Sequence, residues 1–276
     1  MTVVTGPVVL ADAVRRHRRA VLVERAVVSA GIIALGAGAL LFWQFALGSI
    51  VNTRYVSTPL DVVRSLLILI ESGDLLRHIR ATMTEAAAGY VIGVGVGLVG
   101  AFLLLTTRRG YEVLEPYLLA FYAIPKIALA PLFIMWFGLD LAPKILLAAL
   151  MVFFIVFMNT IAGARAIDRG LVDVVRVLGA RRLQLLRAVL LPAAAPAIMA
   201  AVRVTFARAM VGALLAELIS STEGLGYLIV RASRQFDIAT VFGGVLVVAA
   251  LVMAVNVAIR AFEKRLFPWA SGPVHG

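Results

Sequence analysis

Residues 143–163 read PKILLAALMVFFIVFMNTIAG, and residues 164–196 read ARAIDRGLVDVVRVLGARRLQLLRAVLLPAAAP. The first stretch contains a single charged residue, Lys144, and is long enough for an α-helix to cross a bilayer core about 30 Å thick. The second stretch carries too many charges to cross the same core, although its apolar residues recur at helical spacing. This pattern predicts a membrane-spanning helix followed by a helical connection in water, and it decides the fold class.

Five further stretches are apolar and long enough to cross a bilayer: 26–48, 82–106, 115–138, 197–219 and 241–262. Backbone polar groups in lipid need partners within their own segment, so each stretch is predicted to be a helix. The composition agrees, because 62% of the 276 residues are hydrophobic and 15% are charged, with a mean hydropathy of +1.02. The prediction is an all-α polytopic membrane protein with about six transmembrane helices.

These spans divide the chain into an N-terminal segment 1–25, a transmembrane domain 26–265 and a C-terminal tail 266–276. The run 26–48 follows a basic cluster and lacks a clear small-residue cleavage site, so we expect a retained span rather than a signal peptide. The connection 57–80 mixes apolar and charged residues over several helical turns. It is predicted to be either an amphipathic helix on the membrane surface or a loop helix packed on the bundle.

The positive charge is distributed unevenly between the two sides of the predicted spans. The side that holds both termini has sixteen Lys and Arg residues and the other side has seven, which predicts that both termini are cytoplasmic. The net charge of +11 comes from basic residues at the edges of apolar runs, so nucleic-acid binding is not expected. Cys is absent and the three His residues are scattered, so neither a metal site nor a catalytic arrangement is predicted.

The connection 164–196 is predicted to form two short helices joined by a turn. Asp168 precedes the first helix as a candidate N-cap, and Gly179 is suited to end it in the left-handed conformation. The second helix starts at about Arg181, and Pro192 and Pro196 are expected to break or kink the chain at the next membrane boundary. Spacing of three and four residues places on one face of the first helix Leu171, Val174, Val175 and Leu178.

The same segment resembles the EAA motif of binding-protein-dependent ABC importer permeases, which reads Glu-Ala-Ala, three residues, Gly, nine residues, Ile-x-Leu-Pro. The matching residues are Asp173-Val174-Val175, Gly179 and Val189-Leu190-Leu191-Pro192. The spacing, the Gly and the Leu-Pro are kept, whereas Asp replaces Glu, two Val replace the two Ala, and Val replaces Ile. The two valines are bulkier than alanine, so the fit against a partner differs in detail.

Further stretches resemble the nitrate/sulfonate/taurine/bicarbonate branch of that family, so that the resemblance covers about residues 40–265. They are Ala123-Ile124-Pro125-Lys126, Ala130-Pro131, Trp136-Phe137-Gly138, Asn159-Thr160 and Gly224-Leu225-Gly226-Tyr227-Leu228-Ile229. The resemblance implies a type I ABC importer permease (MetI-like) fold in the bacterial cytoplasmic (inner) membrane, with a cytoplasmic coupling helix. It assigns contact with an ATPase to Leu171, Asp173, Val174, Val175, Leu178, Gly179, Ala180, Leu191 and Pro192.

The resemblance also implies a transporter with two permease subunits, two ATPase subunits and an external solute-binding protein. One EAA-like segment and no internal repeat favour a permease homodimer. The chain has no Gly-x-x-x-x-Gly-Lys-Ser/Thr phosphate loop, so ATP and Mg are expected on the partner ATPase and no cofactor on this chain. The chain is therefore not expected to be an enzyme. The rival interpretation is a stand-alone secondary transporter or channel, but the inverted repeats or paired broken helices expected of one are not evident.

A few charged or polar residues within the predicted spans are candidates for the translocation pathway: Lys126, Asn159, Arg208 and Glu217. A cation at the bilayer centre is unfavourable, so such residues usually face a cavity or a partner. Lys126 and Arg208 are hypothesised to attract an anionic solute such as a sulfonate, taurine or nitrate. The alternative is that they pair with Glu217, Glu85 or backbone carbonyls. Glycines at spacing four in the second span (Gly89, Gly93, Gly97) predict close helix packing.

Overall fold

The computed structural model describes residues 27–32, 34–47, 56–107 and 110–266, and the chain divides into two compact units, Met1–Arg64 and Ser65–Gly276. The predicted segment 1–25 and the tail beyond residue 266 lie outside the described residues. In the first unit, the helix that begins at Val27 is long and apolar enough to span a membrane and runs into the π-helix η1 (Phe42–Leu47). The indole Nε1 of Trp43 donates a hydrogen bond of 2.9 Å to the carbonyl oxygen of Ser57.

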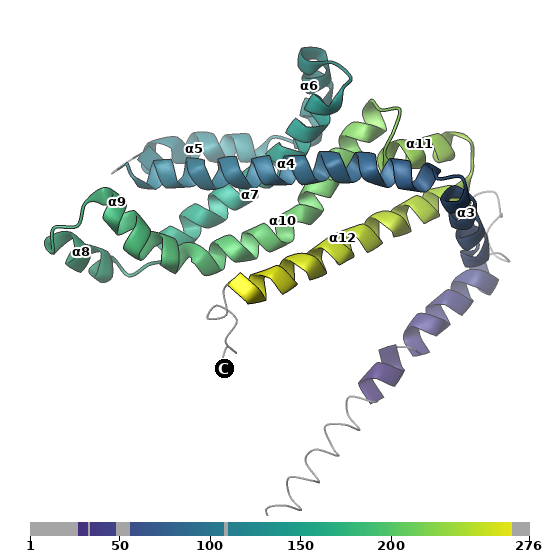
Figure 1. Ribbon diagram of the computed structural model, residues 1–276, viewed down its shortest axis with the longest axis horizontal. Coiled ribbons are helices and arrows are strands. Elements are labelled where there is room, and N and C mark those ends of the chain that lie inside the picture. The colour runs from purple at the N-terminus through teal and green to yellow at the C-terminus, as the bar shows by residue number, and fades with distance from the viewer. Residues whose placement is uncertain (1–26, 33, 48–55, 108–109, 267–276) are drawn as a thin grey trace, which may run out of the picture. The chain divides into compact units, whose positions relative to one another are not determined.

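The described part of the second unit is entirely helical (Figure 1). Helix α3 (Pro59–Glu71) crosses the boundary between the units. The elements that follow are α4 (Asp74–Leu105), α5 (Gly110–Ala123), η2 (Lys126–Leu129), α6 (Ala130–Phe137), α7 (Leu141–Arg165), α8 (Arg169–Val177), α9 (Arg182–Leu185), η3 (Leu186–Leu190), α10 (Leu191–Ile219), α11 (Leu225–Arg234) and α12 (Ile238–Leu266).

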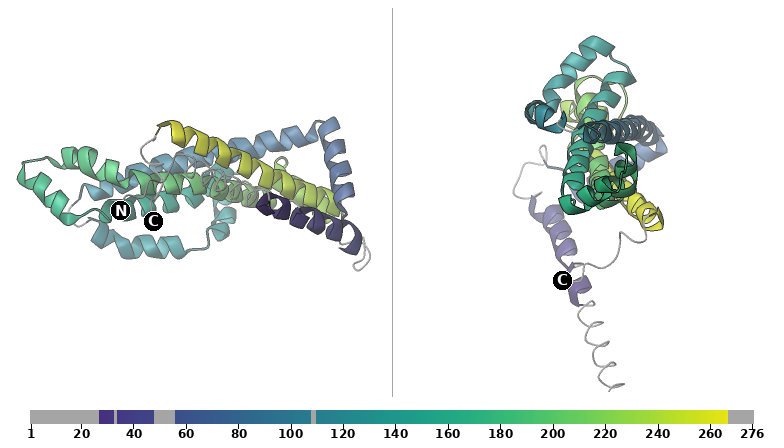
Figure 2. Two further views of the ribbon diagram at one scale, coloured as in Figure 1. Left: turned by 90° about the horizontal axis from the view of Figure 1, so that it is seen from below. Right: turned by 90° about the vertical axis from the view of Figure 1, so that its left-hand side faces the viewer.

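Three long helices, α4, α7 and α10, pack against one another and form the core, and α12 packs on α10 (Figures 1 and 2). Small residues bring their backbones close together, as the spacing of the glycines predicted. A Cβ added to Gly93 would lie 2.5 Å from the carbonyl oxygen of Ala149, and one added to Gly89 would lie 2.4 Å from the Cβ of Ala148. A Cβ added to Gly212 of α10 would lie 2.6 Å from the Cα of Ala148. Ala148 therefore marks the point where the three helices meet.

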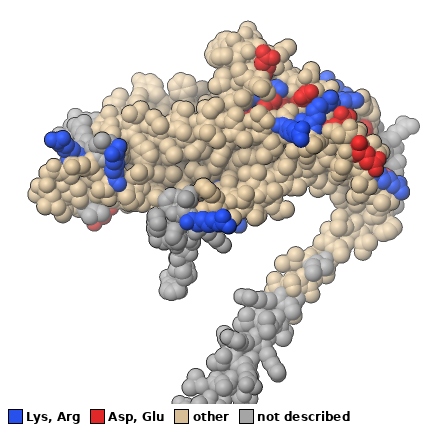
Figure 3. All heavy atoms as spheres, in the orientation of Figure 1, with Lys and Arg blue, Asp and Glu red and all other residues tan. Residues whose placement is uncertain are grey.

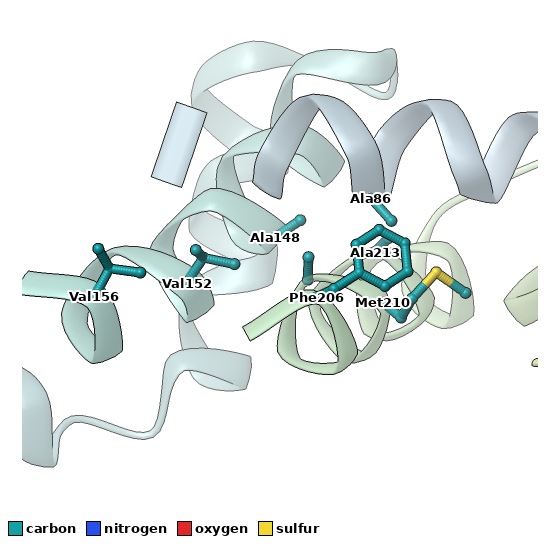
Figure 4. Close-up of a cluster of buried hydrophobic side chains, with 8 residues drawn as sticks. Ala86, Ala148, Val152, Val156, Phe206, Met210 and Ala213 are labelled. Atoms are coloured by element: carbon teal, nitrogen blue, oxygen red, sulfur yellow. The ribbon is translucent and has the colours of Figure 1, made fainter. Parts of the chain in front are cut away.

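Buried apolar side chains fill the space between these helices, as Figure 4 shows for one cluster. Its members come from α4, α7 and α10 and are Ala86, Ala148, Val152, Val156, Phe206, Ala209, Met210 and Ala213. Most of them are small, and a small side chain at a crossing lets two helix backbones approach closely. The core therefore depends on helix proximity more than on bulky side chains.

The predicted crossing 115–138 is not one continuous helix. Helix α5 and the following η2–α6 segment meet at an angle of 82° (Figure 1). Pro125 lacks an N–H and restricts the residue before it, so the α-helix stops at Ala123, and the 3₁₀ turn η2 follows. The backbone between Pro125 and Pro131 is therefore not a regular α-helix. Five described helices can each span a membrane, or six crossings exist if the bent pair counts as one.

The prediction of one connecting helix over 57–80 is wrong in its extent. Helix α3 ends at Glu71, Gly73 takes a positive φ of 76°, and α4 already begins at Asp74, eight residues before the predicted span. Leu66 and Leu69 at the end of α3 pack with Leu75 of α4 and with α11. This contact favours the alternative of a loop helix packed on the bundle.

Candidate functional site: the α8–α9 hairpin and a buried polar cluster

Residues 168–185, which we call the α8–α9 hairpin, begin with the predicted helix cap. The Asp168 Oδ1 atom accepts a hydrogen bond of 2.9 Å from the N–H of Gly170, in the first turn of α8. Gly179 has a φ of 83°, and the N–H of Ala180 donates to the carbonyl oxygen of Val175 at 3.3 Å. This bond and the left-handed glycine together form the Schellman ending of a helix. The predicted cap and the predicted left-handed turn are both confirmed.

Helix α9 starts with a second local cap and leads into the next span without a break. The N–H of Arg181 donates to Oε1 of Gln184 at 2.7 Å, which is one half of a capping box. The π turn η3 then continues directly into α10, where Pro192 occupies the first turn. Of the predicted break or kink at Pro192, the break is absent, and the regular α-helix is instead interrupted by the π turn just before the proline. A π turn widens the helix, and this spreads the carbonyls that the proline ring would otherwise meet.

The hairpin lies at one end of the second unit (Figures 1 and 2). It exposes apolar side chains. Val174 is 58% exposed and Leu178 is 80% exposed, while Val175 is half-buried and Asp173 is exposed. Leu191 and Pro192 at the start of α10 are exposed as well. The side chain of Leu171 lies outside the described residues. Much of the predicted apolar stripe is thus open, although such side chains are usually covered by a partner.

The four residues predicted within spans occupy separate places. Lys126 Nζ donates to the backbone carbonyl of Tyr122 at 2.8 Å and lies 5.0 Å from the ring centroid of Phe154. Arg208 is exposed on α10, and none of the ion pairs among the described residues includes it. Asn159 is exposed on α7 and donates to a carbonyl of its own helix. Glu217 is buried at the far end of α10. No described hydrogen bond joins one of the four to another.

The end of the unit opposite the hairpin holds a buried polar cluster that the sequence did not predict. Its members are His78, Thr82 and Glu85 of α4, Lys144 of α7 and Glu217 of α10, together with the half-buried Ser221. Lys144 Nζ donates to Glu85 Oε1 at 2.8 Å and to Ser221 Oγ at 2.9 Å. Lys144, the single charged residue of the predicted span 143–163, lies in the first turn of α7 with its side chain 9% exposed. A charge that deep requires a partner.

The second part of the cluster fixes the loop between α10 and α11. Glu217 Oε1 accepts from Thr82 Oγ1 at 2.6 Å, and Glu217 Oε2 accepts from the N–H of Gly226 at 2.6 Å. Gly224 has a φ of 110°, and a Cβ there would lie 2.2 Å from the Glu217 carboxyl carbon. The Gly-Leu-Gly sequence noted above thus lets the loop backbone lie against a buried carboxylate. Glu217 of α10 therefore has a partner on another helix, Thr82 of α4.

Arg203, the third cation within a predicted span, also has a partner on another helix. Its Nε and Nη2 atoms donate to the carboxylate of Glu263 on α12, with the Nε bond at 3.0 Å. The two side chains are 37% and 15% exposed. This bidentate ion pair connects α10 to α12 in the half of the unit that is nearer the hairpin.

The arrangement of these helices agrees with comparisons to known proteins. The family model of the binding-protein-dependent transport system inner membrane component matches residues 89–270. The putative aliphatic sulfonates transport permease protein SsuC of Bacillus subtilis (strain 168) is 35% identical over 238 residues, which is 86% of each chain. The riboflavin transport system permease protein RibX of Chloroflexus aurantiacus is 33% identical over 231 residues, or 83% of this chain and 86% of that one.

Among solved structures, an inward-facing conformation of the MetNI methionine ABC transporter has a similar fold. The TM-score is 0.60 at 20% sequence identity, over 71% of this chain and 97% of that chain. The predicted MetI-like permease fold is therefore confirmed. The chain belongs to the binding-protein-dependent transport system inner membrane component family and is a multi-pass permease subunit of an ABC importer.

Proposed function

We propose that this permease subunit serves an ATP-driven importer of a small organic anion, with an aliphatic sulfonate as the first candidate. The observation that carries the proposal is the α8–α9 hairpin. It combines a left-handed glycine, a capped α8 and exposed apolar side chains at the position of the EAA-like motif. The sulfonate assignment is supported by the relative named for aliphatic sulfonates, which is similar over 86% of the chain.

In this proposal the hairpin transmits force from a partner ATPase that binds ATP and Mg. Val174 and Leu178 enter a groove of the ATPase, in the way that an amphipathic helix occupies an apolar groove, and Asp173 meets a basic group at its rim. Gly179 keeps α8 at the angle that the groove requires. Two permease copies and two ATPase subunits form the transporter, and closure of the ATPase pair rocks the spans between inward- and outward-open states.

The orientation follows from the same assignment. The hairpin, both termini and most Lys and Arg residues lie on the cytoplasmic side, as the positive-inside bias predicts. The α11 end and the buried polar cluster then lie on the outer side, where an external solute-binding protein delivers the solute. Along the pathway we assign Lys126, Arg208 and Asn159 to contact with the solute. Glu217 instead positions the α10–α11 loop, because both of its carboxylate oxygens are engaged.

A pair of glycine variants tests the coupling role. Gly179→Val and Gly73→Val place a side chain at similar positive φ values, 83° and 76°, with no atom within 4 Å of the added Cβ at either site. Both variants carry the same kind of backbone strain, but only Gly179 lies in the hairpin. We expect Gly179→Val to lose ATPase co-purification and ATP-driven uptake, and Gly73→Val to keep both. ATP-driven uptake that survives Gly179→Val would contradict the coupling role, and uptake without any ATPase would favour a secondary transporter.

A second candidate solute is riboflavin, because a relative named for riboflavin transport is 33% identical to this chain. Proteoliposomes that contain the whole transporter distinguish the two solutes, when uptake of a radiolabelled aliphatic sulfonate is compared with uptake of radiolabelled riboflavin. We expect uptake of the sulfonate, and a marked decrease with Lys126→Met, because that change removes a cation from the proposed pathway. Unchanged sulfonate uptake by the Lys126→Met variant would eliminate its role in attracting the anion.

A further inference from the structure

Helix α11 ends in a conformation that its residues do not favour. The N–H of Asp237 donates to the carbonyl oxygen of Ala232 at 2.9 Å, and the N–H of Phe236 donates to that of Ser233 at 3.1 Å. These two bonds define a Schellman ending, in which the left-handed position is usually a glycine. Here that position is Phe236, with a φ of 58°, and it is the one non-glycine residue with positive φ among those described.

Another helix of this chain that ends in the same motif has a glycine at the left-handed position. Helix α8 ends in the same motif, and its left-handed position is Gly179. The side chain of Phe236 is 73% exposed, and it takes part in none of the aromatic or cation–π contacts among the described residues. A β-carbon is unfavourable in this conformation, and a phenyl ring in the open adds little to folding. Backbone strain at a residue whose side chain is exposed indicates that the side chain has a functional role rather than a role in stabilising the fold.

Two arginines lie close to Phe236 in the chain. Arg231, Arg234 and Gln235 are exposed, and they line a pocket of about 240 Å³ together with Ser221, Tyr227 and Glu217, whose carboxylate oxygens are already bonded to Thr82 and Gly226. None of the ion pairs among the described residues includes either arginine. Asp237, the residue after Phe236, accepts through its carboxylate from the N–H and the hydroxyl of Thr240 and takes part in none of those ion pairs. We call Arg231, Arg234, Gln235 and Phe236 the Phe236 patch.

The Phe236 patch lies at the opposite end of the unit from the hairpin. Helix α10 connects the two ends over 29 residues, about 44 Å at 1.5 Å per residue. Figure 3 shows charged side chains gathered toward the end that carries α11. Outer segments of membrane proteins are normally poor in Lys and Arg, so basic residues retained on that side call for a partner. Arginine and aromatic side chains are also the types enriched at the energetic centres of protein interfaces.

We propose that the Phe236 patch anchors the external solute-binding protein, a step that rests on the proposed function and its orientation. The phenyl ring enters an apolar depression on that protein, and the two arginines pair with carboxylates around the depression. A lipid surface fits less well, because the aromatic residues favoured at membrane interfaces are Trp and Tyr, which offer a polar atom to the headgroups. The partner is therefore predicted to present an acidic face with an apolar centre.

The test uses the whole transporter in nanodiscs. The purified solute-binding protein of the same transport system is added at increasing concentrations, and the rate of ATP hydrolysis is measured at each. We expect Phe236→Ala and Phe236→Gly each to raise the half-maximal concentration of the binding protein about tenfold, as for loss of an interface anchor. Phe262→Ala is the control, because Phe262 is 63% exposed at the other end of α12 and should leave that concentration unchanged. Phe236→Gly should also melt at a higher temperature than Phe236→Ala, because glycine relieves the left-handed strain.

The outcomes separate the two levels of the proposal. If the binding protein does not stimulate the wild type, the proposed function fails, and this inference fails with it. If it stimulates the wild type and the Phe236 variants at equal concentrations, only the docking role is overturned. If the effect of the variants disappears when anionic lipid is removed from the nanodiscs, the patch binds lipid rather than protein. If Phe236→Gly melts no higher than Phe236→Ala, the argument from backbone strain is refuted.

Discussion

Replacing Lys144 by Met removes the cation of the buried polar cluster and retains the length of the side chain. Glu85 is fully buried, and its Oε1 atom accepts from Lys144 Nζ at 2.8 Å, while its Oε2 atom has no hydrogen-bond partner. The carboxylate therefore depends on Lys144 to balance its charge. Breaking a buried pair from one side typically costs about 3–5 kcal/mol, because an uncompensated charge remains. We expect Lys144→Met to destabilise the permease by an amount in this range.

The double variant Lys144→Met/Glu85→Met gives the sharper result. Replacing both members of a buried pair by apolar side chains of similar size is often neutral or even stabilising, and methionine adapts to irregular spaces. We therefore expect the double variant to recover most of the stability that Lys144→Met loses. Arg77→Met is the control, because the Arg77–Asp74 pair at 3.1 Å is about half exposed and should contribute at most about 1 kcal/mol.

Equilibrium unfolding of the purified permease in mixed micelles, titrated with a denaturing detergent, measures these differences. The four proteins of the cycle yield the interaction energy between the two side chains directly. Additive losses from Lys144→Met and Glu85→Met would refute the reasoning, because they would show that the two charges do not compensate each other. A Lys144→Met variant no less stable than Arg77→Met would refute it as well.

Two further predictions concern helix packing. Gly93→Ala should destabilise the permease by about 1–3 kcal/mol, because its Cβ would lie 2.5 Å from the carbonyl oxygen of Ala149 and force α4 away from α7. Gly95→Ala, two residues on and facing open space, should instead stabilise it by about 0.5–1 kcal/mol through helix propensity, and thermal unfolding of both variants checks the opposite signs. Arg203→Met should cost about 1–2 kcal/mol, between the values for exposed and buried pairs, and should free the end of α12 to exchange its amide hydrogens faster. Unchanged exchange in α12 would mean that the pair does not hold the helix.

Features that depend on neighbours a few residues apart were predictable from the sequence. Apolar runs of bilayer length predicted the membrane helices, because hydropathy over about 20 residues needs no knowledge of the rest of the chain. The ends of α8 were predictable from Asp168 and Gly179, since a cap and a left-handed turn are formed by local backbone atoms. Glycines at spacing four predicted a face for close packing, although not the helix that would occupy it.

Which distant groups meet depends on how whole helices pack. Glu85 and Lys144 are 59 positions apart, and Thr82 and Glu217 are 135 positions apart, so no local pattern connects them. Lys144 lies near the edge of an apolar run, where hydropathy cannot distinguish a solvated cation from one paired inside the bundle. The strained turn at Phe236 and the 82° bend after α5 were also beyond local rules. Each is settled by how whole helices pack, and packing energy outweighs the backbone preference of a single residue.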